Sequence, residues 1–165
     1  MNKLNLNKIK KSDFLKIKEE DVMFITNPGR MGDEDGSTFV LKEDNHYNIC
    51  RIDGWMYPSG NIDENERITL DDARKQFPKW SEAWQNANNE NYQGKYKYLY
   101  MGFGNGLCID NTIYDEFKPY LDEKVKAYLD SHDGDKSLEY TAIFDTWESA
   151  LEEYLSRRNW NEFNN

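Results

Sequence analysis

The chain has 165 residues, which is enough for one domain whose core needs neither disulfides nor a metal ion. Aromatic residues make up 15% of the chain, which argues against a fully disordered protein, and no apolar run reaches the roughly 20 residues of a membrane helix. The 31 acidic and 21 basic residues give a formal net charge of -10, which disfavours general nucleic-acid binding and favours a basic partner.

The N-terminal third is predicted to hold a short helix followed by strands. Residues 1–11 form a basic segment that we expect to be partly frayed. Ser12 is placed to cap a short helix that contains Phe14 and Ile17. Three strand-like runs follow at 22–25, 37–42 and 47–52, and polar turns rich in Gly, Asn and Asp separate them.

Two helices are predicted in the middle of the chain. Thr69 and Asp72 have the spacing of a helix start, so a helix is expected from residue 70 onward. Pro78 interrupts that helix and suits the first position of a second one. Trp80 and Trp84 lie four residues apart, so we expect them on the same face of the second helix.

A β-hairpin is the clearest signal in the sequence. Tyr96, Tyr98 and Tyr100 recur with the period of two that is typical of a strand. Asn105 and Gly106 come next and lead into a second β-type run, and Asn-Gly favours a tight turn because both residues tolerate positive φ. We therefore predict that Gly106 adopts a positive φ at the turn.

The C-terminal third is predicted to contain a helix, a short strand and a second helix. The first helix is expected to begin at about Pro119, and residues 139–144 are interpreted as a last strand. Asp145 and Glu148 have capping-box spacing for the final helix. Its apolar stripe comprises Trp147, Ala150, Leu151, Tyr154 and Leu155.

Together these elements predict a single α+β domain over residues 1–165, with a mainly antiparallel sheet packed against three or four helices. Cys50 and Cys108 are too few for a disulfide-stapled secreted scaffold, and no export signal is visible, so we expect reduced cysteines and a cytoplasmic protein. His46 and His132 are the only histidines, and Cys108 forms a thiol–imidazole pair with either one only if the fold brings them together.

Motifs for catalysis or metal binding are incomplete. The glycines within 102–106 lack the spacing of a dinucleotide loop. Asp110 follows a strand, but Thr112 occupies the position where an aspartyl-phosphate enzyme often has a second carboxylate, so we expect local hydrogen bonds there. The acidic run 130–135 departs from the spacing of a calcium loop. No catalytic residue, metal ligand or cofactor is therefore predicted.

The most unusual segment is an acidic loop flanked by glycines at positions 32 and 36. Its contiguous carboxylates suit the Lys and Arg side chains of a partner, and two aromatic residues beside a later turn suit a protein hot spot. The candidate partner-binding residues are Arg30, Asp33, Glu34, Asp35, Trp55 and Tyr57.

These features predict a small acidic protein-binding protein that acts as an inhibitor or immunity-type factor by covering a basic partner surface. Immunity proteins against toxins share this profile of size and charge. An adaptor or structural subunit of a larger assembly is the alternative, followed by a metal-assisted carboxylate enzyme, although we do not expect an enzyme. Neither a membrane nor a nucleic-acid partner is expected.

Overall fold

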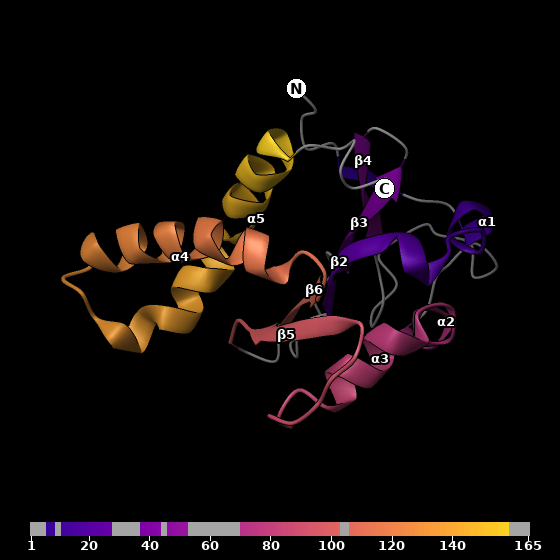
Figure 1. The fold of residues 1–165 in the computed structure, drawn as a ribbon, viewed down its shortest axis with the longest axis horizontal. Helices are drawn as coiled ribbons and strands as arrows, with labels where there is room; N and C mark the ends of the chain where they lie inside the picture. Colours follow the sequence, from indigo (N-terminus) through magenta and orange to yellow (C-terminus); the bar gives the residue numbers. More distant parts are fainter. Residues whose placement is uncertain are drawn as a thin grey trace, which may run out of the picture.

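The computed structural model describes residues 6–8, 11–27, 37–43, 46–52, 70–102 and 106–158. In this part of the chain, a six-stranded sheet lies between two groups of helices (Figure 1). The strands are β1 (Leu6–Lys8), β2 (Val22–Asn27), β3 (Ser37–Glu43), β4 (His46–Ile52), β5 (Tyr96–Tyr100) and β6 (Gly106–Asp110). The helices are α1 (Lys11–Phe14), α2 (Leu70–Gln76), α3 (Pro78–Gln85), α4 (Tyr114–Asp130) and α5 (Glu139–Arg157), with 3-10 turns η1 (Glu19–Asp21) and η3 (Lys136–Leu138).

The sheet has the strand order β1-β4-β3-β2-β6-β5. Its pairings are antiparallel except at one edge, where β1 runs parallel to β4. The prediction of an α+β fold with a mainly antiparallel sheet is thus confirmed. Of the basic N-terminal segment, residues 6–8 form the edge strand, and the expectation that the rest is frayed stays a prediction.

Helices cover both faces of the sheet, and each face has its own apolar cluster. On one face α4 and α5 contribute residues such as Phe117 and Leu151, and on the other α1 to α3 contribute residues such as Phe14 and Trp80. Strand β6 lies between the two clusters, so its side chains at 107–109 are all buried instead of alternating between core and solvent. A strand covered on both faces has this continuous apolar pattern.

Strand β2 contains an irregularity through which it contributes side chains to both apolar clusters. Its pairing with β3 shifts register between Val22 and Phe24. As a result, consecutive Met23 and Phe24 join the cluster beneath α4 and α5, while Val22 and Ile25 join the opposite cluster. A β-bulge places one extra residue on a strand in this way.

Two predictions about the C-terminal third are wrong. Residues 139–144 are the first turns of α5 and not a strand, and Ala142 is buried at helical spacing, eight residues before the buried Ala150. Helix α4 begins at Tyr114 and contains Pro119 in its interior. The helix accepts the proline there although a Pro in that position removes one backbone hydrogen bond.

The predicted β5–β6 hairpin is confirmed by antiparallel pairing from Tyr96 and Asp110 to Tyr100 and Gly106. The reason given for Gly106 is wrong, since the positive φ, +87°, belongs to Gly102. Gly106 is instead the first residue of β6, and a Cβ atom there would overlap the ring of Tyr98. Close approach of an aromatic ring is therefore what the glycine allows.

Candidate functional site

The structure does not test the predicted partner-binding residues. They lie within 28–36 and 53–69, outside the residues that the structure describes, and they are Arg30, Asp33, Glu34, Asp35, Trp55 and Tyr57. Their role stays a prediction. The candidate surface below is therefore built from the described residues alone.

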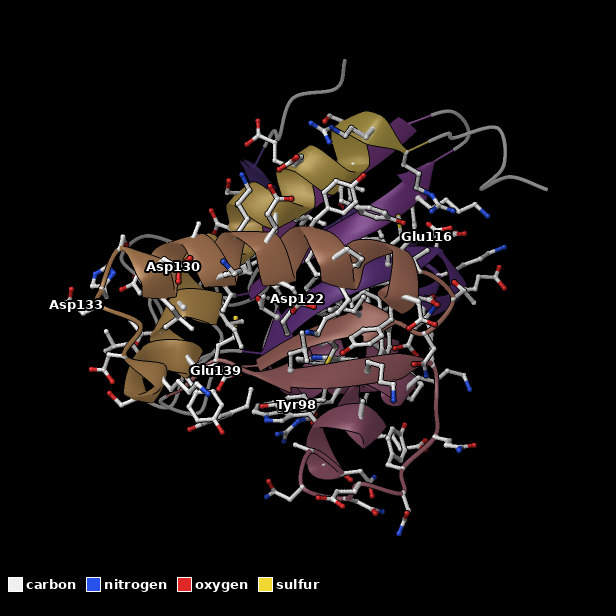
Figure 2. The ribbon with its side chains drawn as sticks, turned by 60° about the vertical axis from the view of Figure 1, so that its left-hand side comes forward. Tyr98, Glu116, Asp122, Asp130, Asp133 and Glu139 are labelled. Carbon is white, nitrogen blue, oxygen red and sulfur yellow. The ribbon has the colours of Figure 1, made fainter. Side chains whose placement is uncertain are left out.

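The helical hairpin of α4 and α5 concentrates the negative charge of the molecule. Residues 114–158 hold twelve acids and six bases, which is a net charge of -6. Figure 2 shows Asp130, Asp133 and Glu139 at the end where the two helices are connected, while Glu116 lies near the opposite end of α4. The acids thus extend along the length of the hairpin.

Most of the basic side chains of this hairpin are already engaged within it. Five of the six form ion pairs with acids of the same hairpin: Lys118 with Asp122, Lys124 with Glu153, Lys126 with Asp130, Arg157 with Glu153 and Arg158 with Glu116. Eight of the twelve acids stand outside the ion pairs formed by the described residues: Asp115, Glu123, Asp133, Asp135, Glu139, Asp145, Glu148 and Glu152. Their charge is directed to solvent and is available to a cation that approaches from outside.

A partly buried polar cluster fixes α4 against α5. The hydroxyl of Tyr154 donates to Oε2 of Glu116 at 2.8 Å, and the guanidinium of Arg158 donates to both side chains. Burial, together with the hydrogen bond to Glu116, raises the pKa of Tyr154, so the hydroxyl keeps its proton and remains a donor. The cluster holds the two helices in one relative position without a reacting group.

Exposed apolar side chains gather beside the start of α5. Among the described residues, four large apolar side chains are exposed, and three of them are Tyr100, Tyr140 and Phe144. The ring centroids of Tyr100 and Tyr140 lie 5.0 Å apart in an edge-to-face arrangement, and Phe144 follows Tyr140 by one helical turn. We call these three residues the aromatic patch.

The two aromatic residues of the patch on α5 continue the apolar stripe of that helix. Trp147, Ala150, Leu151 and Tyr154 are buried, so they define the inner face of the helix. Tyr140 and Phe144 lie seven and three residues before Trp147, so by helical spacing they continue the stripe of Trp147 toward the start of α5, where they are exposed. The error that assigned 139–144 to a strand concealed this part of the stripe in the sequence.

A second polar network ties η1 to α3, and it is structural. The carboxylate of Glu19 accepts hydrogen bonds of 2.9 Å from the backbone N–H groups of Lys79 and Trp80, and the Tyr96 hydroxyl lies 3.4 Å away. Pro78 opens the helix and has no N–H, so Glu19 binds the first two donors that the helix offers. Burial raises the pKa of the Glu19 carboxyl.

The thiol of Cys108 and the imidazole of His132 are not brought together. Cys108 is a free cysteine with no exposed surface, and burial raises the pKa of its thiol, which keeps it unreactive. His132 lies in the exposed turn after α4 and stacks on Tyr128 at 4.3 Å. Asp110 makes the local hydrogen bonds that the sequence predicts, accepting from the backbone N–H of Thr112 and from Lys95.

A polar hollow of about 500 Å³ lies where the chain enters β5. One charged side chain, Lys97, is among the residues that line it: Tyr92, Gln93, Gly94, Tyr96, Lys97 and Asn111. Burial raises the pKa of Tyr92 to about 12, so its phenol is neutral. Apart from Lys97, the hollow is therefore lined by uncharged side chains.

Within the described residues, no three side chains of His, Cys, Asp or Glu are arranged to hold a metal ion. The helices in this part of the chain also include none that is long and apolar enough to cross a membrane. Comparison with known protein families, curated proteins and solved structures found no match to this chain.

Proposed function

We propose that this chain binds a protein with a basic surface and acts as an inhibitor or immunity-type factor by covering that surface. The observation that carries the proposal is the charge of the α4–α5 hairpin, in which eight acids stand outside the ion pairs of the described residues. Ion pairs between these acids and bases of the same hairpin would stabilise the fold only slightly. Exposed acids outside such pairs instead attract a cationic partner.

The physical effect of this charge is mainly on the rate of encounter. Exposed carboxylates attract a basic protein over roughly the Debye length, which is about 8 Å at physiological salt. Steering of this kind raises the association rate by about 10-fold or more at low salt and loses its effect as salt is added. Salt dependence is therefore the measurable property that separates this function from uncharged binding.

The test uses a partner that has been captured on the immobilised chain from an extract of its native host and then produced in pure form. Association and dissociation rates are measured at low and high salt for the wild type and for the double variant Glu148→Lys and Glu152→Lys. The matched control is Glu20→Lys, an exposed acid on η1 outside the hairpin. We expect the double variant to associate about 10-fold more slowly at low salt and the control to change little.

An activity assay of the purified partner separates an inhibitor from an adaptor. An inhibitor lowers that activity in proportion to the complex formed, whereas a structural adaptor leaves it unchanged. Association rates that do not depend on salt, in the wild type and both variants, would refute the role of the acidic hairpin. Reversal of Asp33, Glu34 and Asp35 to Lys tests the predicted loop in the same assay, with slower association expected and folding unchanged.

A further inference from the structure

We infer that the aromatic patch of Tyr100, Tyr140 and Phe144 is the anchoring centre of the partner-binding surface, and that it receives a basic protein segment whose apolar side chains alternate with Lys or Arg. This inference rests on the proposed function and adds the place and the chemistry of the contact. The patch supplies the apolar contact, and the surrounding carboxylates select the charge of the occupant.

Among the described residues, the exposure of these rings contrasts with the burial of large side chains close to them in the sequence. The side chains of Tyr100, Tyr140 and Phe144 are 42%, 53% and 47% exposed, whereas Met101 and Trp147, close by in sequence, are 3% and 7% exposed. Exposed aromatic residues grouped in one place are typical of protein-binding surfaces.

The rings are held in position before any partner binds. Tyr100 ends β5 and contacts Tyr140 on α5, so two rigid elements carry the patch. The backbone at Gly102 passes close to Tyr140, because a Cβ atom on Gly102 would lie 3.7 Å from the Cβ atom of Tyr140. Aromatic side chains on rigid elements lose little conformational entropy on binding, which favours their use as anchors.

The acids around the patch decide between possible occupants. Glu139 directly precedes Tyr140, Glu148 follows Phe144 by one turn, and Glu152 follows by two turns. The bases nearest in the sequence are Lys136, four residues before Tyr140, and Lys97, three residues before Tyr100. A second copy of the chain would bring like charges together, and an anionic lipid surface would be repelled by the same carboxylates. A cationic protein segment is attracted by them, and its Arg or Lys side chains can also stack on the tyrosine rings.

The two parts of the surface should affect different rate constants. The carboxylates act over a distance and control association, whereas the aromatic rings act only in contact and control dissociation. Loss of the rings should therefore weaken binding to a similar degree at every salt concentration. Loss of the carboxylates should reduce the salt dependence itself.

The experiment uses two labelled peptides of equal length and charge as probes. One is an amphipathic helix of Lys and Leu, and the other has Ser in place of every Leu. Fluorescence anisotropy gives the affinity of each peptide for the wild type, for the double variant Tyr140→Ser and Phe144→Ser, and for Leu15→Ser. Leu15 is the matched control, because it is the fourth exposed large apolar side chain among the described residues. It is 57% exposed and lies just after α1, outside the aromatic patch.

We expect the double variant to bind the Lys–Leu peptide about 10-fold or more weakly than the wild type at every salt concentration. Leu15→Ser should bind within about twofold of the wild type, because its side chain lies outside the patch. The Lys–Ser peptide should bind the wild type and the double variant equally. Thermal unfolding verifies that the double variant is folded, and if it is not, hydrogen exchange of residues 139–145 in the wild type replaces it, with protection by the Lys–Leu peptide expected.

Equal binding of the Lys–Leu peptide to wild type and double variant, or no protection of 139–145, would overturn the inference and leave the proposed function intact. The proposed function fails instead if neither cationic peptide nor a basic protein binds the wild type. Sedimentation velocity and anionic phospholipid vesicles test the other occupants. Self-association or vesicle binding that disappears in the double variant would also overturn the inference.

Discussion

Removal of the Glu19 carboxylate tests how η1 is joined to the start of α3. Glu19 belongs to η1, yet it accepts hydrogen bonds from two backbone N–H groups at the start of α3, which lies 60 residues later in the chain. Its Oε2 also lies 3.4 Å from the hydroxyl of Tyr96 on β5. The residue at the N-cap position of α3, Phe77, makes no capping hydrogen bond of its own, so the carboxylate of Glu19 serves as the cap.

The cost of Glu19→Ala follows from these contacts. Loss of a helix cap costs about 1 kcal/mol, and up to about 2 kcal/mol in favourable cases. A buried tyrosine hydroxyl that loses its acceptor adds about 1 kcal/mol. We therefore expect the free energy of unfolding to fall by about 2 kcal/mol, which lowers the melting temperature by about 4–8 °C for a domain of this size.

The assay is urea unfolding followed by far-ultraviolet circular dichroism, with three variants compared to the wild type. Glu19→Gln keeps one acceptor oxygen, so we expect it to lose about half as much stability as Glu19→Ala. Glu20→Ala is the matched control, because Glu20 is exposed, carries the same charge and lies next to Glu19 on η1. A loss in Glu19→Ala no larger than the loss in Glu20→Ala would refute the capping role.

The pH dependence gives an independent measurement at the same residue. Burial raises the pKa of the Glu19 carboxyl above 4.5, so the folded chain holds this proton more tightly than the unfolded chain does. The wild type should therefore lose stability relative to the non-titrating Glu19→Gln variant as the pH rises from 4.5 through the raised pKa. A difference in unfolding free energy between the wild type and Glu19→Gln that changes in the opposite direction with pH would contradict this reasoning.

Three further predictions concern the core and the hairpin. Trp147→Ala should lower the free energy of unfolding by about 3 kcal/mol or more, because Trp147 is buried and its removal leaves a cavity; a loss below about 1 kcal/mol in urea unfolding would contradict its place in the core. Gly106→Val should lower the free energy of unfolding more than Gly102→Ala, because the valine side chain would overlap the Tyr98 ring. Gly102→Ala should cost about 1 kcal/mol through backbone strain. Tyr98→Ala should restore part of the stability lost in Gly106→Val. Cys108 should react with a thiol reagent only as fast as the protein unfolds, and rapid labelling of the native protein, followed by mass spectrometry, would show that β6 is more accessible than its burial implies.

Local patterns in the sequence determine much of the secondary structure. Pro78 starts α3 as predicted, because its ring suits the first turn of a helix and its missing N–H is not needed there. Trp80 and Trp84 share one face of α3 and stack with centroids 5.6 Å apart, as their spacing of four predicts. The period of two in Tyr96–Tyr100 likewise predicts β5, since neighbouring residues decide such elements.

The failures occur where tertiary packing overrides local preference. Tyr140, Thr141, Ile143 and Phe144 are residue types that favour strands, yet they belong to α5 because the helix buries Ala142 and continues into a long apolar stripe. Pro119 is a poor interior helix residue, but α4 extends through it while Phe117 and Leu121 are buried on either side. Burial of a whole helix face outweighs the cost at a single position.

The binding surface itself depends on contacts that the sequence cannot specify. The composition determines that the chain is acidic, but only the tertiary structure decides which bases are engaged in ion pairs and which acids remain available. Tyr100 and Tyr140 are 40 residues apart in the chain and meet only because the end of β5 lies beside the start of α5. Periodicity determines which residues share a face of an element, whereas packing decides which part of that face is covered, and Tyr140 and Phe144 stay exposed on the same stripe that buries Trp147.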